Sequence, residues 1–399
     1  MIRVLGNSSF RNLWLASLLS LTGSQISRVG LILYVSSTGD SVLALALLLT
    51  LELLPGAIVA PLAGVVIDAY SKRAVMIVAD LLRMIFMLFI WWRPTAGMIY
   101  VMAALHSIAT VFYLPAKSAL LPAVVEESDL PKANGLDQSA LSMTLVAGPI
   151  IGAELLILVG LKATLIVDAL SFLASALLVT RVKSRAVIRE YVELSLASTV
   201  ENVKAGWSYV TAHRLLLRLN VMVFVSFLCA GMWIPLAPSF VRDQLSGSSR
   251  LIGWQMGIWG LGAIFGGLLA PSLVRRFGKG LMVFLGLLTE GVSLSLYAVV
   301  SHIGISMVIM FELGIVVSIV VVAFYSILQT VVEEPFLGRV FSIVKQSENV
   351  AVVLAMVFAV LLHGFLESHV IFLVAGLSYV ALTIASSFSR SGRLLLGTR

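Results

Sequence analysis

Residues 303–330 read IGISMVIMFELGIVVSIVVVAFYSILQT, and Glu312 is the one charged side chain in this stretch. A helix rises about 1.5 Å per residue, so about 20 apolar residues cross the roughly 30 Å of hydrocarbon in a bilayer. A helix also satisfies its own backbone hydrogen bonds where no water is present. The stretch therefore predicts a membrane-spanning helix.

Similar apolar stretches fill almost the whole chain of 399 residues, which is 60% hydrophobic and 12% charged. A soluble domain with that composition would have too little polar surface to cover itself. The sequence therefore predicts an all-α membrane protein with twelve spans. Their expected ranges are 10–36, 41–67, 74–92, 97–121, 134–158, 161–180, 214–240, 251–274, 280–300, 303–330, 338–363 and 369–388.

The basic residues indicate how these spans are oriented. Lys and Arg near the ends of spans favour the cytoplasmic face, and most of the 27 fall on the face that is expected to hold both termini. We therefore expect a multi-pass protein of the plasma (inner) membrane with both termini in the cytoplasm. The net charge of +7 then reflects a basic inner rim, and it needs no nucleic-acid partner to explain it.

An internal repeat divides the chain. An offset near 207 residues aligns the basic turn around Asp68–Arg73 with Arg275–Lys279, and the loop between the fourth and fifth spans with Gly338-Arg339. The predicted parts are an N-terminal six-helix bundle at 1–180, a cytoplasmic linker with an amphipathic helix at 181–213, and a C-terminal six-helix bundle at 214–399. Two parallel pseudo-symmetric halves suit alternating access around a cavity between them.

Several motifs carry a resemblance to a known family. Gly64-Val-Val-Ile-Asp68-Ala-Tyr-Ser71-Lys72-Arg73 resembles the signature loop of the major facilitator superfamily, with Ala69 and Ser71 in place of the usual basic residue and glycine. Asp80-Leu-Leu-Arg83 and Pro115-Ala-Lys117-Ser-Ala-Leu-Leu-Pro122 resemble stretches of its drug and siderophore exporter branch, which includes the enterobactin and macrolide efflux proteins. The resemblance implies the major facilitator fold. It also implies a gate that contains Gly64, Asp68, Lys72, Arg73, Asp80 and Arg83.

The charges of the signature loop suggest how such a gate closes. Asp68 is placed to cap a neighbouring helix N-terminus or to pair with a basic residue, which would hold the inward gate closed. Asp68→Asn is then expected to shift cysteine accessibility toward the cytoplasmic side. Lys72 and Arg73 fit either this gate or ordinary markers of the inner face.

Gly148-Pro149-Ile-Ile-Gly152 is similar to the antiporter signature of the superfamily's fifth helix. Two glycines one turn apart allow close helix contact, while Pro149 frees a carbonyl and bends the helix. This composition favours a seal that opens by rocking, although simple helix packing explains it as well.

The ionisable residues expected inside the hydrocarbon are the main candidates for function. Each charge there costs on the order of several kcal/mol unless it is paired, hydrated or neutralised. Pairs are expected between Arg28 and Glu52 on adjacent helices and between Asp80 and Arg83 one turn apart. The candidates for substrate binding and proton coupling are Gln25, Arg28, Glu52, Asp168, Glu290 and Glu312. For the last three, a proton carrier and a hydrogen-bonded packing group both remain open.

The sequence shows no motif for ATP binding, metal binding or nucleophilic catalysis. It contains no G-x-x-x-x-G-K-[ST] loop for ATP, its 5 histidines show no metal-ligand spacing, and no Ser–His–Asp order stands out. We therefore expect neither an enzyme nor a cofactor or metal, and a proton gradient as the energy source.

These observations predict a secondary transporter that exports a hydrophobic or amphiphilic small molecule in exchange for protons. Its expected partners are that substrate, protons and membrane lipid, and the chain is expected to act as a monomer. A lipid or lysophospholipid flippase of the same fold is an alternative, because residues 115–122 and 133–136 also resemble lysophospholipid transporters. An intramembrane enzyme is a remote alternative.

Overall fold

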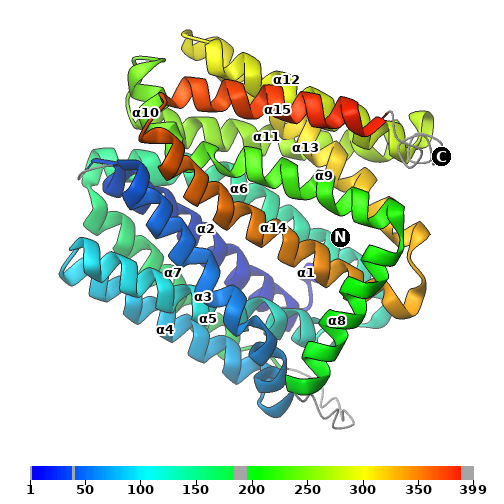
Figure 1. Ribbon diagram of the computed structural model, residues 1–399. Coiled ribbons are helices and arrows are strands. Elements are labelled where there is room, and N and C mark those ends of the chain that lie inside the picture. Colours follow the sequence, from blue (N-terminus) through cyan, green and yellow to red (C-terminus); the bar gives the residue numbers. More distant parts are fainter. Residues whose placement is uncertain (1, 38–40, 184–195, 388–399) are drawn as a thin grey trace. The chain divides into compact units, whose positions relative to one another are not determined.

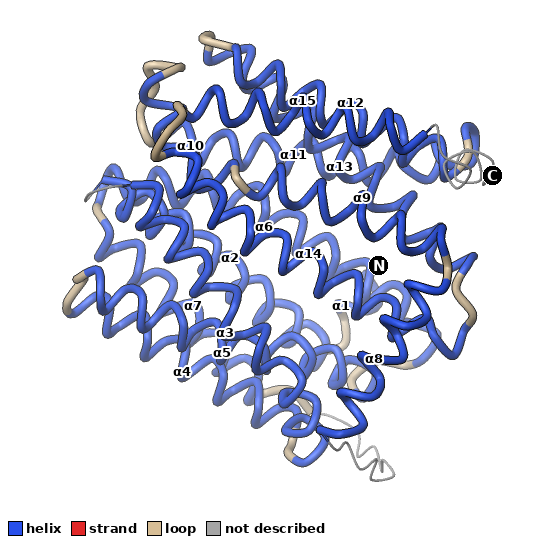
Figure 2. The backbone as a smooth tube through the Cα atoms, viewed as in Figure 1, coloured by secondary structure: helices blue, strands red, loops and turns tan. Residues whose placement is uncertain are grey.

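The computed structural model of the chain describes residues 2–37, 41–183 and 196–387. Helices joined by short loops make up this part of the chain, and it contains no strand (Figure 2). The elements are α1 Ile2–Leu5, α2 Ser8–Ser37, α3 Ser41–Ala69, α4 Lys72–Trp92, α5 Ala96–Leu120, the 3-10 helices η1 Leu121–Ala123 and η2 Glu127–Asp129, α6 Leu130–Val159, α7 Leu161–Thr180, α8 Leu196–Ala212, α9 Arg214–Gly231, α10 Trp233–Asp243, α11 Arg250–Phe277, α12 Lys279–Val299, α13 Ile303–Val331, α14 Glu334–His363 and α15 Ser368–Ser387.

Twelve helical stretches within the described ranges are long and apolar enough to cross a membrane, which confirms the predicted number of spans (Figure 1). Their ends follow local chemistry that hydropathy alone misses. The side-chain oxygen of Asn7, for example, accepts hydrogen bonds from the backbone N–H groups of Ser9 at 3.0 Å and Phe10 at 3.2 Å. Because the first N–H groups of a helix have no partner inside it, such a side chain caps the start of α2.

The seventh predicted span, 214–240, is not one continuous helix. α9 ends at Gly231 and α10 begins at Trp233, so Met232 interrupts the span. The ring of a proline clashes with the carbonyl four residues earlier, and its nitrogen cannot donate a hydrogen bond. Pro235 stands four residues after Gly231, which explains why the helix breaks at this point.

The chain divides into two compact units. Unit 1 contains Met1–Gly39 and Leu47–Leu196, and unit 2 contains Asp40–Ala46 and Ala197–Arg399. Within unit 1, α2 packs against α6 and α7, and α4 packs against α5 and α7. The residues that fill its core include Phe10, Met76 and Val179, which are fully buried.

Unit 2 repeats these pairings with the later helices. α9 packs against α14 as α2 packs against α6, and α12 packs against α13 and α15 as α4 packs against α5 and α7. α11 packs against α13, where Gly262, Gly266 and Gly314 let the two backbones approach closely. The repeat of helix pairings confirms the two pseudo-symmetric six-helix halves that the sequence predicts.

The amphipathic helix expected in the linker corresponds to α8. Its side chains are described from Lys204 onward, and residues 184–195 of the predicted linker lie outside the described part. The Tyr209 ring stacks on Phe336 with 4.4 Å between the ring centroids, and Val210 is buried, while Trp207 is exposed. The helix therefore packs against the start of α14 within unit 2.

Candidate functional site

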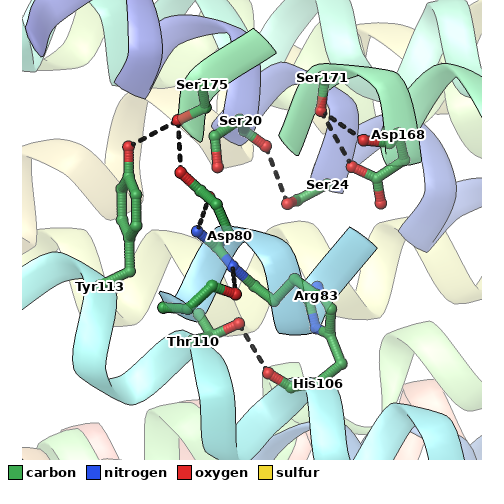
Figure 3. Close-up of polar contacts among 11 residues, drawn as sticks. Ser20, Ser24, Asp80, Arg83, His106, Thr110, Tyr113, Asp168, Ser171 and Ser175 are labelled. Carbon is green, nitrogen blue, oxygen red and sulfur yellow. Dashed lines mark hydrogen bonds and ion pairs between the residues drawn. The ribbon is translucent and has the colours of Figure 1, made fainter. Parts of the chain in front are cut away.

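Asp80 and Arg83 of α4 form the centre of a buried polar site in unit 1, and Figure 3 shows this site. Asp80 is 0% exposed and pairs with Arg83 one helical turn away, as the sequence predicts. The Ser175 hydroxyl of α7 donates a hydrogen bond of 2.7 Å to the other carboxylate oxygen. The Tyr113 hydroxyl of α5 lies 3.3 Å from the Ser175 oxygen. Three helices are therefore tied together through one carboxylate.

The Arg83 guanidinium lies between two aromatic rings. Its central carbon is 4.4 Å from the centroid of Tyr113 and 4.5 Å from that of Phe172. A cation over a ring face is attracted by the ring's quadrupole, and this attraction grows where water is excluded. The aromatic rings and Asp80 together offset the cost of burying this charge. A buried cation that is held by a carboxylate and two rings suits a structural link between helices better than a group that exchanges its partners.

Asp168 of α7 forms a second buried carboxylate in unit 1. The hydroxyl of Ser27 donates to one of its oxygens, and the hydroxyl of Ser171 lies 3.3 Å from the other. Gly23 of α2 lies against this group, where a Cβ atom would come within 2.7 Å of the Asp168 Oδ1 atom. The contact explains why α2 has no side chain at that point. None of the hydrogen bonds described for the Asp168 side chain comes from a cation.

A third buried ionic group was not among the predicted site residues. The Lys117 ammonium of α5 lies 2.8 Å from the Asp137 carboxylate of α6 and donates a 2.7 Å hydrogen bond to the Ser17 hydroxyl of α2. Lys117 belongs to the stretch that resembles the exporters, but hydropathy places it among ordinary basic residues at a span end. Helical spacing could not have found the pair, because Lys117 and Asp137 lie on different helices.

The expected pair between Arg28 and Glu52 is present. The Arg28 Nε atom of α2 lies 3.1 Å from the Glu52 Oε2 atom of α3, and the two side chains are 40% and 19% exposed. This pair is therefore more accessible than Asp80 with Arg83. A molecule that reaches the pair can compete for Arg28 or Glu52, which a fully enclosed pair does not allow.

The motif of the fifth predicted span lies next to this pair. Gly148 packs against the side chain of Gln25, and a Cβ atom on Gly152 would come within 2.6 Å of the Ile26 carbonyl oxygen. Both glycines therefore hold α6 close to α2. Pro149 stands inside α6, which runs without a break from Leu130 to Val159.

The remaining predicted gating residues cluster where α3 ends and α4 begins. One guanidinium nitrogen of Arg73 donates a 3.0 Å hydrogen bond to the Val182 carbonyl, which ties the start of α4 to the residues after α7. Lys72 is half-buried. Gly64 and Asp68 lie in α3, but their side-chain surroundings fall outside the described part, so the capping role of Asp68 stays a prediction.

Glu290 of α12 is the central acidic residue of unit 2. It is buried, and its Oε2 atom accepts hydrogen bonds from the Tyr379 hydroxyl at 2.8 Å and the Ser226 hydroxyl at 3.0 Å. These donors come from α15 and α9, so three helices meet at the carboxylate. Glu312 of α13 is half-buried and interacts electrostatically with it. The described side chains supply hydroxyl donors to Glu290 and no salt bridge.

Glu348 of α14 is a further acidic residue that the sequence does not single out. The Lys345 ammonium lies 2.8 Å from one of its oxygens, and the Tyr325 hydroxyl lies 3.3 Å from the other.

The predicted site residues fall into separate groups. Gln25, Arg28, Glu52 and Gly148 gather in one part of unit 1, Asp80, Arg83 and Asp168 in another, and Glu290 with Glu312 in unit 2.

Comparisons with known proteins agree with this architecture. A family model described as "Transmembrane secretion effector" matches residues 3–390. Macrolide efflux protein A of Streptococcus pyogenes is 23% identical over 388 residues, which cover 94% of each chain. The uncharacterised MFS-type transporter YvqJ of Bacillus subtilis (strain 168) is 24% identical over 354 residues, covering 86% of this chain and 83% of that protein.

A solved structure supports the fold independently of sequence. The crystal structure of a bacterial homologue of the iron transporter ferroportin, in an inward-facing state, matches with a TM-score of 0.78 at 16% identity, over 98% of this chain and 100% of that one. The predicted fold class is thereby confirmed. The chain belongs to the transmembrane secretion effector family of the major facilitator superfamily, and it is a multi-pass membrane transporter.

Proposed function

We propose that this transporter exports a hydrophobic or amphiphilic small molecule in exchange for protons, by alternating access of its two units. The buried Glu290 carboxylate is the observation that carries the proposal. In this proposal the transporter acts as a monomer in the inner membrane, and it needs no cofactor and carries out no catalytic step.

The surroundings of Glu290 suit the binding of a proton. Its described hydrogen bonds come from the hydroxyls of Tyr379 and Ser226, and its neighbour Glu312 is also acidic. A buried carboxylate that lacks a cationic partner is costly in a low-dielectric region. Binding one proton removes that charge and leaves a group that still accepts hydrogen bonds. Proton binding and release at Glu290 can therefore bias the transporter between two states.

The Arg28–Glu52 pair supports substrate binding in unit 1. It is partly exposed and lies close to Gln25, which packs against Gly148 of α6. A substrate that competes for either member would also change how α2 and α3 are linked. The macrolide efflux relative supports a bulky, amphiphilic substrate and the outward direction of transport.

The test uses the full chain in proteoliposomes with an imposed pH gradient and a radiolabelled macrolide. We expect the wild type to accumulate macrolide only under the gradient. Glu290→Gln is expected to remove the dependence on the gradient, because the amide cannot take up a proton. Glu367→Gln is the matched control, because that carboxylate is 83% exposed. Transport by the wild type that ignores the gradient would reject proton coupling.

The same vesicles separate export from lipid flipping. Movement of a fluorescent lysophospholipid between leaflets, without macrolide accumulation, would replace the export proposal with the flippase alternative. Glu52→Gln tests the role of the pair in unit 1. If both macrolide transport and its pH profile survive this change, Glu52 takes no part in coupling.

A further inference from the structure

A groove on the surface of unit 1 has no role in the proposed export. It has a volume of about 520 Å³ and is lined by side chains of α3, α4 and α5. Small or branched residues make its floor, where Val75, Ala79 and Ala109 are buried. Val78, Leu82 and Leu105 stand exposed around it. None of the described lining residues carries a charge.

The groove follows one face of α4, within the membrane-spanning range Lys72–Trp92. Its lining includes Ala74 near the start of α4 and Phe86 well inside it. These residues are 12 positions apart in α4, which corresponds to about 18 Å. Half of a hydrocarbon core is about 15 Å thick, so the groove extends across about one leaflet. Its dimensions therefore match a single acyl chain.

Two basic residues adjoin one end of the groove in the chain. Tyr70 and Ala74 line this end, and Lys72 and Arg73 lie between them in the chain. The hydrogen bond from Arg73 to the Val182 carbonyl leaves its positive charge in place, because a carbonyl is neutral. No carboxylate whose side chain is described forms a salt bridge with Lys72 or Arg73. An anionic group beside the 70–73 turn would therefore be attracted.

We propose that this groove is a binding site for an anionic glycerophospholipid from the leaflet at the 70–73 turn, with one acyl chain in the groove and the phosphate beside Lys72. A void in the hydrocarbon would forfeit the dispersion contacts of its walls, so a chain is expected to fill it. Apolar contact alone cannot select this lipid, because the surrounding tails are equally apolar. Selection comes from the basic side chains, each worth about 1 kcal/mol toward an anionic head group.

The test measures lipid binding to the purified, delipidated full chain in detergent by native mass spectrometry. The probes are dioleoylphosphatidylglycerol, which is anionic, and dioleoylphosphatidylcholine, which is zwitterionic and has the same tails. Lys72→Gln is expected to weaken phosphatidylglycerol binding about fivefold and to leave phosphatidylcholine unchanged. Its matched control is Lys279→Gln, the equivalent position under the internal repeat, which is expected to change neither.

A second variant tests the groove. Ala74→Phe, at an exposed position in its lining, is expected to reduce the binding of both lipids, whereas Ala381→Phe, on an exposed face of α15, is expected to have no effect. Unchanged lipid binding by Ala74→Phe would overturn the proposal, as would equal losses in Lys72→Gln and Lys279→Gln. Displacement of phosphatidylglycerol by a macrolide would assign the groove to the transported substrate instead. The readout is binding, so its outcome does not depend on the proposed proton coupling.

Discussion

At the scale of single residues, the sequence predicts the Asp80–Arg83 pair within one helix and the Arg28–Glu52 pair on adjacent helices, but it misses other partners that lie on different helices. Asp80 and Arg83 stand one turn apart, so their ion pair follows from helical spacing and is confirmed. Ser175 completes the site from a position 95 residues away, and the Lys117–Asp137 pair joins two different helices. Helical periodicity gives the face on which a residue lies, but it does not say which helix packs there.

Loss of one member of the buried pair is expected to destabilise the protein strongly. Asp80→Asn leaves the Arg83 guanidinium buried without its carboxylate, which costs about 3 kcal/mol or more. Asp243→Asn removes a carboxylate from an exposed pair with Arg242 and is expected to cost about 1 kcal/mol or less. Thermal unfolding in detergent micelles measures the difference. The double variant Asp80→Asn/Arg83→Met should melt above Asp80→Asn, and a lower melting temperature would contradict the argument.

Two glycines of α6 are expected to respond in opposite directions to the same substitution. Gly152→Ala places a Cβ atom 2.6 Å from the Ile26 carbonyl oxygen and 3.0 Å from its Cα atom, so α2 and α6 must separate at a cost of about 1–3 kcal/mol. Gly135→Ala meets no atom within 4 Å and gains about 0.5–1 kcal/mol of helix preference. Melting temperatures in micelles check both changes. Equal shifts in the two variants would show that the close contact does not limit stability.

At the scale of elements, hydropathy predicts the spans well because bilayer thickness sets the length of each one. It does not register where a span is interrupted. Pro235 is visible in the seventh span, yet an average over about 20 residues hides the break that it causes after Gly231. Ser226 of α9, which donates to Glu290, lies before the interruption and was not predicted from the sequence.

Tyr209 joins α8 to the start of α14 by two contacts. Tyr209 stacks on Phe336 at 4.4 Å, and its hydroxyl accepts a 3.4 Å hydrogen bond from the Glu333 backbone N–H. Such an aromatic pair contributes about 0.5–1.5 kcal/mol beyond area burial. Tyr209→Ala is therefore expected to speed amide hydrogen exchange in α8, whereas Trp207→Ala, at an exposed position of the same helix, is not. Equal exchange in both variants would mean that other contacts hold α8.

At the scale of the whole molecule, the sequence predicts two similar halves from a few aligned landmarks, and the repeated helix pairings confirm them. The polar chemistry does not repeat in the same way. Unit 1 buries Asp80 with a cation that lies between aromatic rings, whereas Glu290 of unit 2 receives hydroxyl donors. The described hydrogen bonds to the Asp168 side chain of unit 1 also come from hydroxyls, so the difference between the halves is the enclosed Asp80–Arg83 pair of unit 1. Only the side-chain contacts reveal it, because the sequence places acidic residues in both halves.

The orientation of the chain in the membrane remains a prediction, and the low cysteine content makes it testable. The chain has 1 cysteine, Cys229, which is buried, so new cysteines at exposed loop positions report their own accessibility. Seven spans separate Ser71 from Ser301, which places these residues on opposite faces. Because Lys72 and Arg73 adjoin Ser71, this face is expected to be cytoplasmic. A membrane-impermeant maleimide should therefore label Ser301→Cys in intact cells and Ser71→Cys only after permeabilisation. The reverse pattern would invert the topology, and it would place the lipid site of the 70–73 turn in the outer leaflet.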